Sequence, residues 1–412
     1  MPVEAVDAQH QVKLSTSLLW TMAIACDIAV ANIYYNQPML TDMARSFHAS
    51  AGQIGFVATA TQAGYAVGMP AFIPLADFVD RRSLLAGLFA AAAASAALLA
   101  LGTSLPVVIF ASFLLGATSV IAQILIPFAA EIARPDQQGH VIGILLSGVL
   151  LGILSARTMS GFVAHAMGWR SMFWIAAALS LALSLVLAIG LPRIHAKPAI
   201  SYTAFMRSIV TLPFEVPALF RVGMRSGMFF AAFIAFWTTL VFLLETPPYH
   251  YGSQLAGIFG LVGIVGASVA PLAGKMADRR GPQFVLGTAV AICLAAFLVF
   301  QIWGWHLWGL VVGVILLDAG VQAAQVSNQS SAFSLLPKSR NRVNTVYMVC
   351  YFGGGTLGSL AGTWAWERAQ WTGVCLTAMA FLFVAAALLW YDRRSNPSRL
   401  AAEGCADTCK VI

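Results

Sequence analysis

The sequence predicts an all-α membrane protein of twelve transmembrane helices, arranged as two pseudo-symmetric bundles of six. The composition is the first reason: 59% of the 412 residues are hydrophobic and 9% are charged, whereas soluble domains average about 45–50% and about 25%. Second, apolar stretches of the ~20 residues that span a bilayer recur along the whole chain. Third, the two halves of the sequence repeat each other's features.

Twelve apolar segments account for the predicted helices. The first is of full spanning length and carries an acid at its centre, so we do not expect it to be a cleaved signal peptide. The segments are 14–36, 53–75, 83–102, 105–131, 140–164, 170–191, 219–244, 255–276, 283–303, 308–332, 343–365 and 372–391.

A polar break rich in proline and charge separates the sixth segment from the seventh. Prolines and charges both disfavour a spanning helix. Within the break, "SYTAFMRSIV" reads as a short amphipathic helix at the membrane surface. The expected units are a cytoplasmic N-terminus (1–13), a six-helix bundle (14–191), a cytoplasmic central loop (192–218), a second bundle (219–391) and a cytoplasmic tail (392–412).

The basic residues are distributed unevenly between the two sides of the predicted membrane. All but four of the 23 Lys and Arg residues fall in the N-terminus, the even-to-odd loops or the tail, or at the helix ends that face them; the exceptions are Arg45, Arg157, Arg170 and Arg368. Positively charged loops stay in the cytoplasm, so both termini are predicted there. The net charge of +7 is therefore a topology signal and predicts no nucleic-acid partner.

Four residue pairs recur at an offset of 201 or 202 positions, which indicates an internal duplication of the kind common in transporters. Each pair occupies corresponding positions of the two halves. The pairs are Asp77 with Asp278, Gln123 with Gln325, Val141 with Val343, and Trp169 with Trp371.

The loop "GKMADRRG" resembles the cytoplasmic G-x-x-x-D-R-x-G loop of the major facilitator superfamily, and "IPLADFVDRR" resembles its first-half copy without the glycines. The resemblance covers nearly the whole chain. It implies a carrier whose two halves tilt about a central site, with the loop acids helping to hold one closed state; the alternative is that they only anchor loop ends. The implied gating residues are Asp77, Arg81, Arg82, Gly274, Asp278, Arg279, Arg280 and Gly281.

The stretch "GILSARTMSG" resembles the helix-5 motif of the drug:proton antiporter and sugar-efflux branch of bacterial exporters. Small residues remain at four of its five motif positions, but Arg157 replaces the proline. The arginine that this branch carries in helix 4, expected near Ser112, is absent. The usual coupling arginine therefore cannot be transferred to this chain.

Three charged residues lie deep in the predicted helices: Asp27, Arg157 and Asp318. At 1.5 Å per residue they lie roughly 20, 25 and 21 Å from the cytoplasmic boundary. A charge at such depth costs about 2.5–3.5 kcal/mol on insertion scales and usually has a partner. We therefore predict an Asp27–Arg157 pair that faces Asp318 and couples transport to protons; the alternative is a static pair that fixes helix packing.

The stretch "DIAVANIYYNQPML" gives the first helix a polar and aromatic strip, and Asp318 begins a similar strip in the tenth. Helices 1 and 10 line the cavity in the resembled family, so these residues are candidates for substrate binding. Interhelical hydrogen bonding is the alternative for the glutamines, and lipid-facing packing for the aromatics. The candidates are Asn32, Tyr34, Tyr35, Asn36, Gln62, Gln123, Phe233, Trp237, Gln322, Gln325 and Gln329.

The leading functional prediction is a proton-coupled antiporter that exports a small organic solute, since a carboxylate can hold or release a proton within the transport path. Proton-linked uptake on the same fold is the alternative. A membrane enzyme or receptor is remote, because the chain lacks H-E-x-x-H, Walker and Ser–His signatures. We expect no metal, no cofactor and a functional monomer in a bacterial inner membrane. Cys405 and Cys409 lie in the expected tail, with no role assigned.

Overall fold

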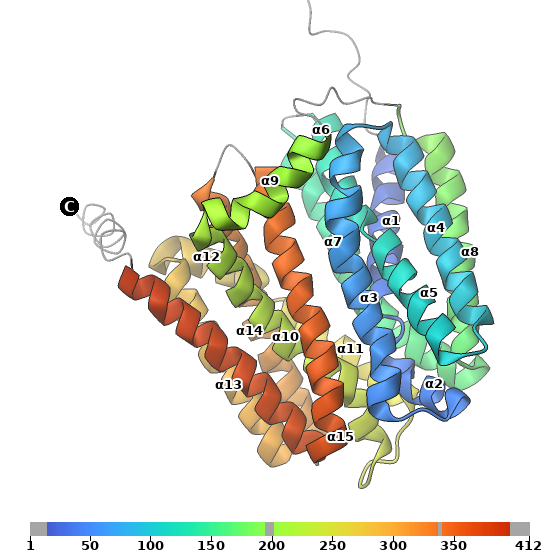
Figure 1. Cartoon of the computed structure of the whole chain (residues 1–412), viewed down its shortest axis with the longest axis vertical. Helices are drawn as coiled ribbons and strands as arrows, with labels where there is room; N and C mark the ends of the chain where they lie inside the picture. The colour runs from blue at the N-terminus through green and yellow to red at the C-terminus, as the bar shows by residue number, and fades with distance from the viewer. Residues whose placement is uncertain (1–14, 135, 194–201, 337–339, 396–412) are drawn as a thin grey trace, which may run out of the picture.

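The structure is a computed structural model that describes residues 15–134, 136–193, 202–336 and 340–395. Helices and the turns that join them make up this part of the chain (Figure 1). The helices are α1 Thr16–Tyr34, η1 Gln37–Met39, α2 Leu40–Phe47, α3 Ala51–Phe72, η2 Pro74–Asp77, α4 Arg81–Leu101, α5 Leu105–Thr118, α6 Ile121–Ile132, α7 Gln138–Met167, α8 Trp169–Gly190, α9 Tyr202–Glu215, α10 Pro217–Glu245, α11 Ser253–Ala267, α12 Ala270–Arg280, α13 Pro282–Trp303, α14 Leu307–Leu335 and α15 Arg340–Ser395.

The described helices are compatible with the twelve predicted segments. By length and composition, nine described helical stretches can cross a membrane. One of them, within α15, is 53 residues long and bends at Ala369 and Gln370, so it covers the last two predicted segments. The fourth and eighth predicted segments are each broken into two helices, α5 with α6 and α11 with α12. The predicted amphipathic helix in the central loop is present as α9.

Local sequence explains several helix ends. Ser15 and Asp80 cap α1 and α4 through their side chains, and Ser50 forms a capping box with Gln53 at the start of α3. Gly168 and Gly281 adopt φ values of 84° and 80° between consecutive helices. These are left-handed conformations that glycine reaches without a steric penalty, so each glycine permits a sharp reversal between two long helices.

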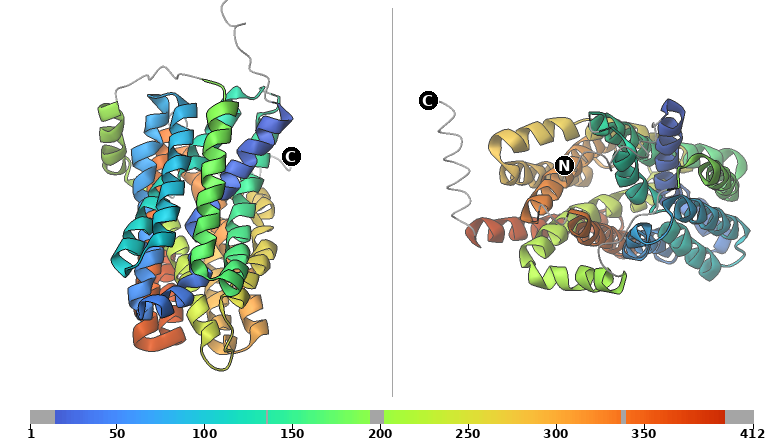
Figure 2. Two further views of the ribbon diagram at one scale, coloured as in Figure 1. Left: turned by 90° about the vertical axis from the view of Figure 1, so that its right-hand side faces the viewer. Right: turned by 90° about the horizontal axis from the view of Figure 1, so that it is seen from above.

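Helices α1–α8 gather on one side of the molecule and α10–α15 on the other (Figures 1 and 2). Within the first half, α1 packs on α7 and α4 on α8; within the second half, α10 packs on α15 and α13 on α14. The halves meet along α3 with α15 and along α7 with α11. The molecule therefore has one long interface between two helical bundles.

Glycines bring equivalent helix pairs together in both halves. A Cβ on Gly152 would lie 2.4 Å from the backbone oxygen of Asp27, and a Cβ on Gly354, 202 positions later, would lie 2.0 Å from that of Gly227. Neither position can hold a larger residue without moving a backbone. The pair α1–α7 and the pair α10–α15 thus use the same close approach.

Polar contacts between the halves cluster toward the end of the molecule that carries α2 and the 246–252 loop, which we call the α2 end; the opposite end, with η2 and α9, is the α9 end (Figure 1). Arg45 of α2 forms an ion pair with Glu245 of α10 at 2.7 Å. The Glu367 carboxylate of α15 accepts hydrogen bonds from the Ser50 hydroxyl and the Gly52 amide at the start of α3. These contacts hold the two halves together at the α2 end.

Candidate functional site

A cavity that is partly open to solvent lies between the two halves. Helices α1, α3, α6 and α7 line it from the first half, and α10, α14 and α15 line it from the second. Its residues are Val30, Ile33, Tyr34, Tyr65, Gln123, Val149, Leu150, Ile153, Leu154, Phe230, Phe233, Asp318, Val321, Gln322, Gln325, Met348, Tyr351 and Phe352.

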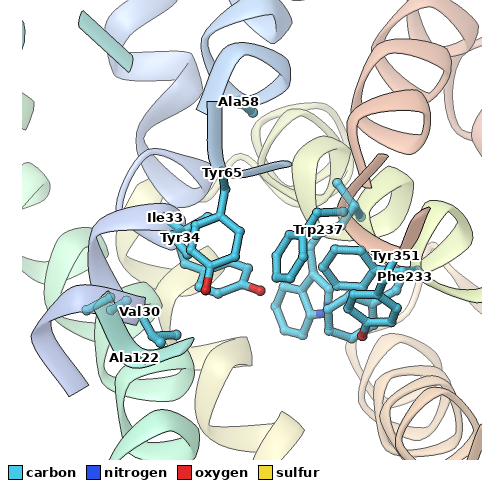
Figure 3. Packing of buried hydrophobic residues seen from close by; sticks show 14 of the residues in the cluster. Val30, Ile33, Tyr34, Ala58, Tyr65, Ala122, Phe233, Trp237 and Tyr351 are labelled. Carbon is cyan, nitrogen blue, oxygen red and sulfur yellow. The ribbon is translucent and has the colours of Figure 1, made fainter. Parts of the chain in front are cut away.

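Aromatic rings form two facing walls of this cavity. Tyr34 and Tyr65 extend from one side, and Phe233 and Tyr351 from the other, with Trp237 beside Phe233 (Figure 3). Tyr351 is itself stacked on a further ring of α10, with centroids 4.0 Å apart. Such packed rings have few accessible rotamers, so the walls present a fixed apolar surface with phenol groups at its edge.

Asp318 is the acid that lines the cavity, and its side chain comes from the middle of α14. The residue is 4% exposed, and its Oδ2 atom has no hydrogen-bond partner. Gln322 and Gln325, one and two turns further along α14, line the same cavity, as their i+4 and i+7 spacing predicts. A buried carboxylate oxygen without a donor is costly, which points to a proton or a ligand as its partner.

Arg157 of α7 lies in the wall behind the rings. Its side chain is buried, with Cζ 3.8 Å from the Trp237 ring centroid, 5.1 Å from that of Tyr34 and 5.5 Å from that of Phe233. Nε donates a hydrogen bond to Gln37 at 3.0 Å. The two terminal nitrogens, Nη1 and Nη2, have no acceptor. The cation–π contacts compensate part of the cost of burying the charge but leave two donors free.

A glycine face on α11 brings Arg157 and Asp318 close to each other. A Cβ on Gly260 would lie 3.0 Å from Arg157 Cβ, and one on Gly263 would lie 3.2 Å from Asp318 Oδ1. Three residues of α-helix rise about 4.5 Å, so the two side chains meet α11 less than one turn apart. They interact electrostatically, yet no ion pair joins them among the described residues.

The predicted Asp27–Arg157 pair is wrong. The Asp27 carboxylate instead accepts a hydrogen bond from Ser155 at 3.4 Å, on a partly exposed seam between α1 and α7. Trp20 and Ile24, on the same face of α1, are 57% and 52% exposed. The depth estimate placed Asp27 along the helix axis but carried no information on the direction in which its side chain points.

Several other candidates join helices and do not line the cavity. Asn32 donates a hydrogen bond to Ser180, Asn36 to Thr61 and Gln329 to Asn344. These three residues therefore form hydrogen bonds between segments, which was the alternative to substrate binding. The remaining three, Tyr35, Gln62 and Trp237, are buried outside the lining set, and Trp237 borders a small separate cavity beside Arg157. Tyr34, Gln123, Phe233, Gln322 and Gln325 are the substrate candidates that line the central cavity.

In the first-half loop for which a gating role was predicted, the charged groups contact one another within the same half. Arg81 lies 3.5 Å from Asp77, pairs with Glu131 and bonds the Ala76 carbonyl, while Arg82 donates to the Leu191 carbonyl. Burial raises the pKa of Asp77, and the Arg81 guanidinium opposes this shift.

In the second-half loop, Gly274 lies within α12, and Arg279 and Arg280 are exposed near its end. Gly281 follows them with its left-handed backbone. The Asp278 side chain lies outside the described set.

The sequence analysis missed two sets of residues, the additional cavity aromatics and a buried arginine network. Tyr65, Phe230 and Tyr351 line the cavity, and the tyrosines, polar aromatics in mid-helix, were the available signal. Arg225 is 3% exposed and donates to Asn328 at 2.8 Å and Asp392 at 2.7 Å, which joins α10, α14 and α15. Counted among the basic residues at cytoplasmic helix ends, Arg225 gave no sign of this buried network.

Comparison with known proteins identifies the relatives of this chain. The profile described as Major Facilitator Superfamily matches residues 22–355. The uncharacterized transporter YgaY of Escherichia coli O157:H7 is 37% identical over 380 residues, covering 92% of this chain and 96% of that protein. A chloramphenicol resistance protein of Streptomyces lividans is 26% identical over 288 residues, covering 68% and 71%.

Among solved structures, the chain is similar to a bacterial homologue of the human lysosomal transporter Spinster in an inward-facing, unoccupied conformation. The TM-score is 0.72 at 15% identity, and the match covers 91% of this chain and 96% of that one. At this identity the likeness concerns the fold.

Proposed function

Because this chain belongs to the major facilitator superfamily of transporters, we propose that it exports a small organic solute across the bacterial inner membrane in exchange for protons. A single monomer transports the solute by alternating access. The two halves tilt about the central cavity and open it to one side of the membrane at a time. The solute is a small molecule, and the bilayer and protons are the other partners.

The observation that carries this proposal is the unpartnered Asp318 carboxylate inside a cavity shared by both halves. A carboxylate at this place can bind a proton or the cationic group of a solute, but not both at once. Competition of two ligands for one group is the requirement for exchange, because the carrier then returns with one or the other.

In this proposal Arg157 acts together with Asp318, and not with Asp27 as the sequence suggested. A positive charge that interacts with Asp318 favours the ionised carboxylate and so makes proton release possible inside an apolar cavity. Asp27, on its seam with Ser155, is left out of the proposed coupling path.

We also propose that the α9 end is cytoplasmic, as the loop charges indicate. The closed α2 end would then face outward, and the molecule would be inward-facing. Single cysteines at Arg207 of α9 and His250 near the α2 end, both exposed, test this in a chain without its native cysteines. A membrane-impermeant thiol reagent outside intact cells is expected to label position 250 alone; labelling of position 207 alone would reverse the topology.

The test of function is transport by the purified chain in proteoliposomes with an imposed pH gradient. Solutes of varied charge and polarity are screened, with drugs included because a relative is named for chloramphenicol resistance. The proposal predicts accumulation that follows the gradient and collapses with a protonophore. Transport that ignores the gradient would refute proton coupling.

Proton-linked uptake is the second candidate, and the Arg157–Asp318 geometry is the observation that favours it. A proton on Asp318 would remove the negative charge near Arg157 and free the guanidinium for an anionic solute. Proton and solute would then bind together, which is the requirement for symport. The direction of solute movement relative to the gradient separates the two candidates.

A further inference from the structure

We propose that the solute is a zwitterion with its cationic and anionic groups close together, as in an α-amino acid, whose ammonium binds Asp318 and whose carboxylate binds Arg157. This inference rests on the proposed function and specifies its substrate class. It predicts that neither charge alone makes a good ligand.

The unmet hydrogen-bonding capacity of the site is the first argument. Asp318 has an unpartnered acceptor, Oδ2, and Arg157 has two unpartnered donors, Nη1 and Nη2. The two residues are 4% and 1% exposed, so bulk water does not satisfy these atoms readily. A solute that carries both an ammonium and a carboxylate would satisfy all of these atoms. The ammonium would donate to the Asp318 carboxylate, and the carboxylate would accept charge-assisted hydrogen bonds from the Arg157 nitrogens.

The proximity of the two groups is the second argument. Arg157 Cβ contacts Gly260 and Asp318 Oδ1 contacts Gly263, three residues apart on α11, and the two charged groups interact electrostatically. They do not form an ion pair with each other. In an α-amino acid a single carbon separates the ammonium from the carboxylate, so one small molecule can bridge the acid and the guanidinium.

The charge balance is the third argument. A solute with only a cation would bring a second positive charge beside Arg157, and one with only an anion would bring a second negative charge beside Asp318. Like charges in a low-dielectric site repel strongly. A zwitterion adds no net charge, and its ammonium competes with the proton on Asp318, as the proposed exchange requires. The displaced proton passes to cavity water.

The rings define the body of the solute. The guanidinium lies behind Tyr34 and Phe233, so the carboxylate end is expected to enter between these rings, with the side chain along the aromatic walls. The walls favour an aromatic or branched apolar side chain. Besides Arg157, the titratable groups that interact with Asp318 are Cys293 of α13 and Tyr351 of α15.

The experiment measures binding to the purified full-length chain by the quenching of tryptophan fluorescence, with Trp237 beside the site. Three matched sets are compared: phenylalanine, tryptophan and leucine, each with its amide, which keeps only the cation, and its deaminated acid, which keeps only the anion. We expect at least one amino acid to bind about tenfold or more tightly than both of its analogues, equivalent to about 1.4 kcal/mol.

Two variants and a control assign the groups. Asp318→Asn is expected to abolish the preference for the amino acid over the deaminated acid, and Arg157→Gln its preference over the amide. Asp27→Asn should keep both preferences. The inference would be overturned if none of the three amino acids bound more tightly than both of its analogues, or if no amino acid bound at all. If gradient-driven transport of other solutes persists in that case, the proposed function survives; if no solute follows the gradient, both fail.

Discussion

Asp27 and Asp318 are two acids at nearly the same depth of two apolar helices, yet they occupy different environments. Asp27 lies on a partly exposed seam, where Ser155 donates to it. Asp318 is 4% exposed and lines the cavity between the halves, with one oxygen free. The difference shows that the direction of a side chain around its helix, more than its depth, decides whether a charged group faces the cavity.

The helices that pack around the two acids also differ. Around Asp318, α11 presents glycines that let α7 and α14 pack against it, so Arg157 and Asp318 contact the same helix without forming an ion pair. Around Asp27, Gly152 of α7 brings the backbones together while the carboxylate stays at the rim of the contact. Glycine therefore contacts the buried carboxylate itself in one region and only the helix backbone in the other.

Replacement of each acid by its amide should give the largest contrast. Asp318→Asn is expected to lower the rate of gradient-driven transport by about 100-fold, the upper range of a coupling free energy between two sites. Asp27→Asn should change it by less than about twofold. Initial rates in proteoliposomes measure both, with protein content normalised. Comparable losses in the two variants would remove the distinction between the seam and the cavity.

Gly263→Ala should have the next largest effect, because its Cβ would meet Asp318 Oδ1 at 3.2 Å. Crowding of this kind costs about 1–3 kcal/mol when neighbours must shift. The expected result is a lower melting temperature in detergent and slower transport. Gly87→Ala of α4 is the matched control, since a Cβ there has nothing within 4 Å. Equal behaviour of the two variants would show that the α11 face does not position Asp318.

Double-mutant cycles on melting should separate the partners of Arg157. Arg157→Gln combined with Asp318→Asn is expected to deviate from additivity by about 0.5–3 kcal/mol, because the two side chains interact. Combined with Asp27→Asn, the deviation should stay within about 0.5 kcal/mol. The opposite pattern would restore the Asp27–Arg157 pair that the sequence suggested.

Glu367→Gln should produce the smallest change, at the closed α2 end. The carboxylate sits on the first turn of α3, where a negative charge contributes about 0.3–1 kcal/mol. A cysteine at Gln322 in the cavity should become up to about fivefold more reactive to an impermeant reagent from the α2 side. Glu215→Gln on exposed α9 is the control. Unchanged reactivity would mean that this contact does not help to close the α2 end.

The sequence was sufficient for the family and the helical fold, because hydropathy and a repeated offset depend only on residue order. The shared face of Asp318, Gln322 and Gln325 was also predictable from the sequence, since i, i+4 and i+7 positions lie on one face of any helix. The helix break at Ser119 was missed because no charge or proline stands beside it. The break at Val269 had an available signal, since Pro271 lies in the first turn of α12.

The arrangement of the buried charged residues was harder to predict from the sequence. Arg157 could be given a depth but not a partner, because its environment comes from α1, η1 and α10, which are far apart in the chain. The glycine face of α11 was visible as "GIFGLVG", but its meaning depends on which helices pack on it. Tertiary contacts of this kind leave no periodic signal in a single sequence.

The central claim, that Asp318 carries the exchangeable proton, is tested most directly by following protons and solute together. Proteoliposomes containing a pH indicator are given a transported solute, and solute-for-solute exchange is measured in parallel. The account predicts that Asp318→Asn still exchanges solute for solute but moves no protons, while wild type and Asp27→Asn move both. Solute-dependent proton movement by Asp318→Asn at the wild-type rate would contradict it.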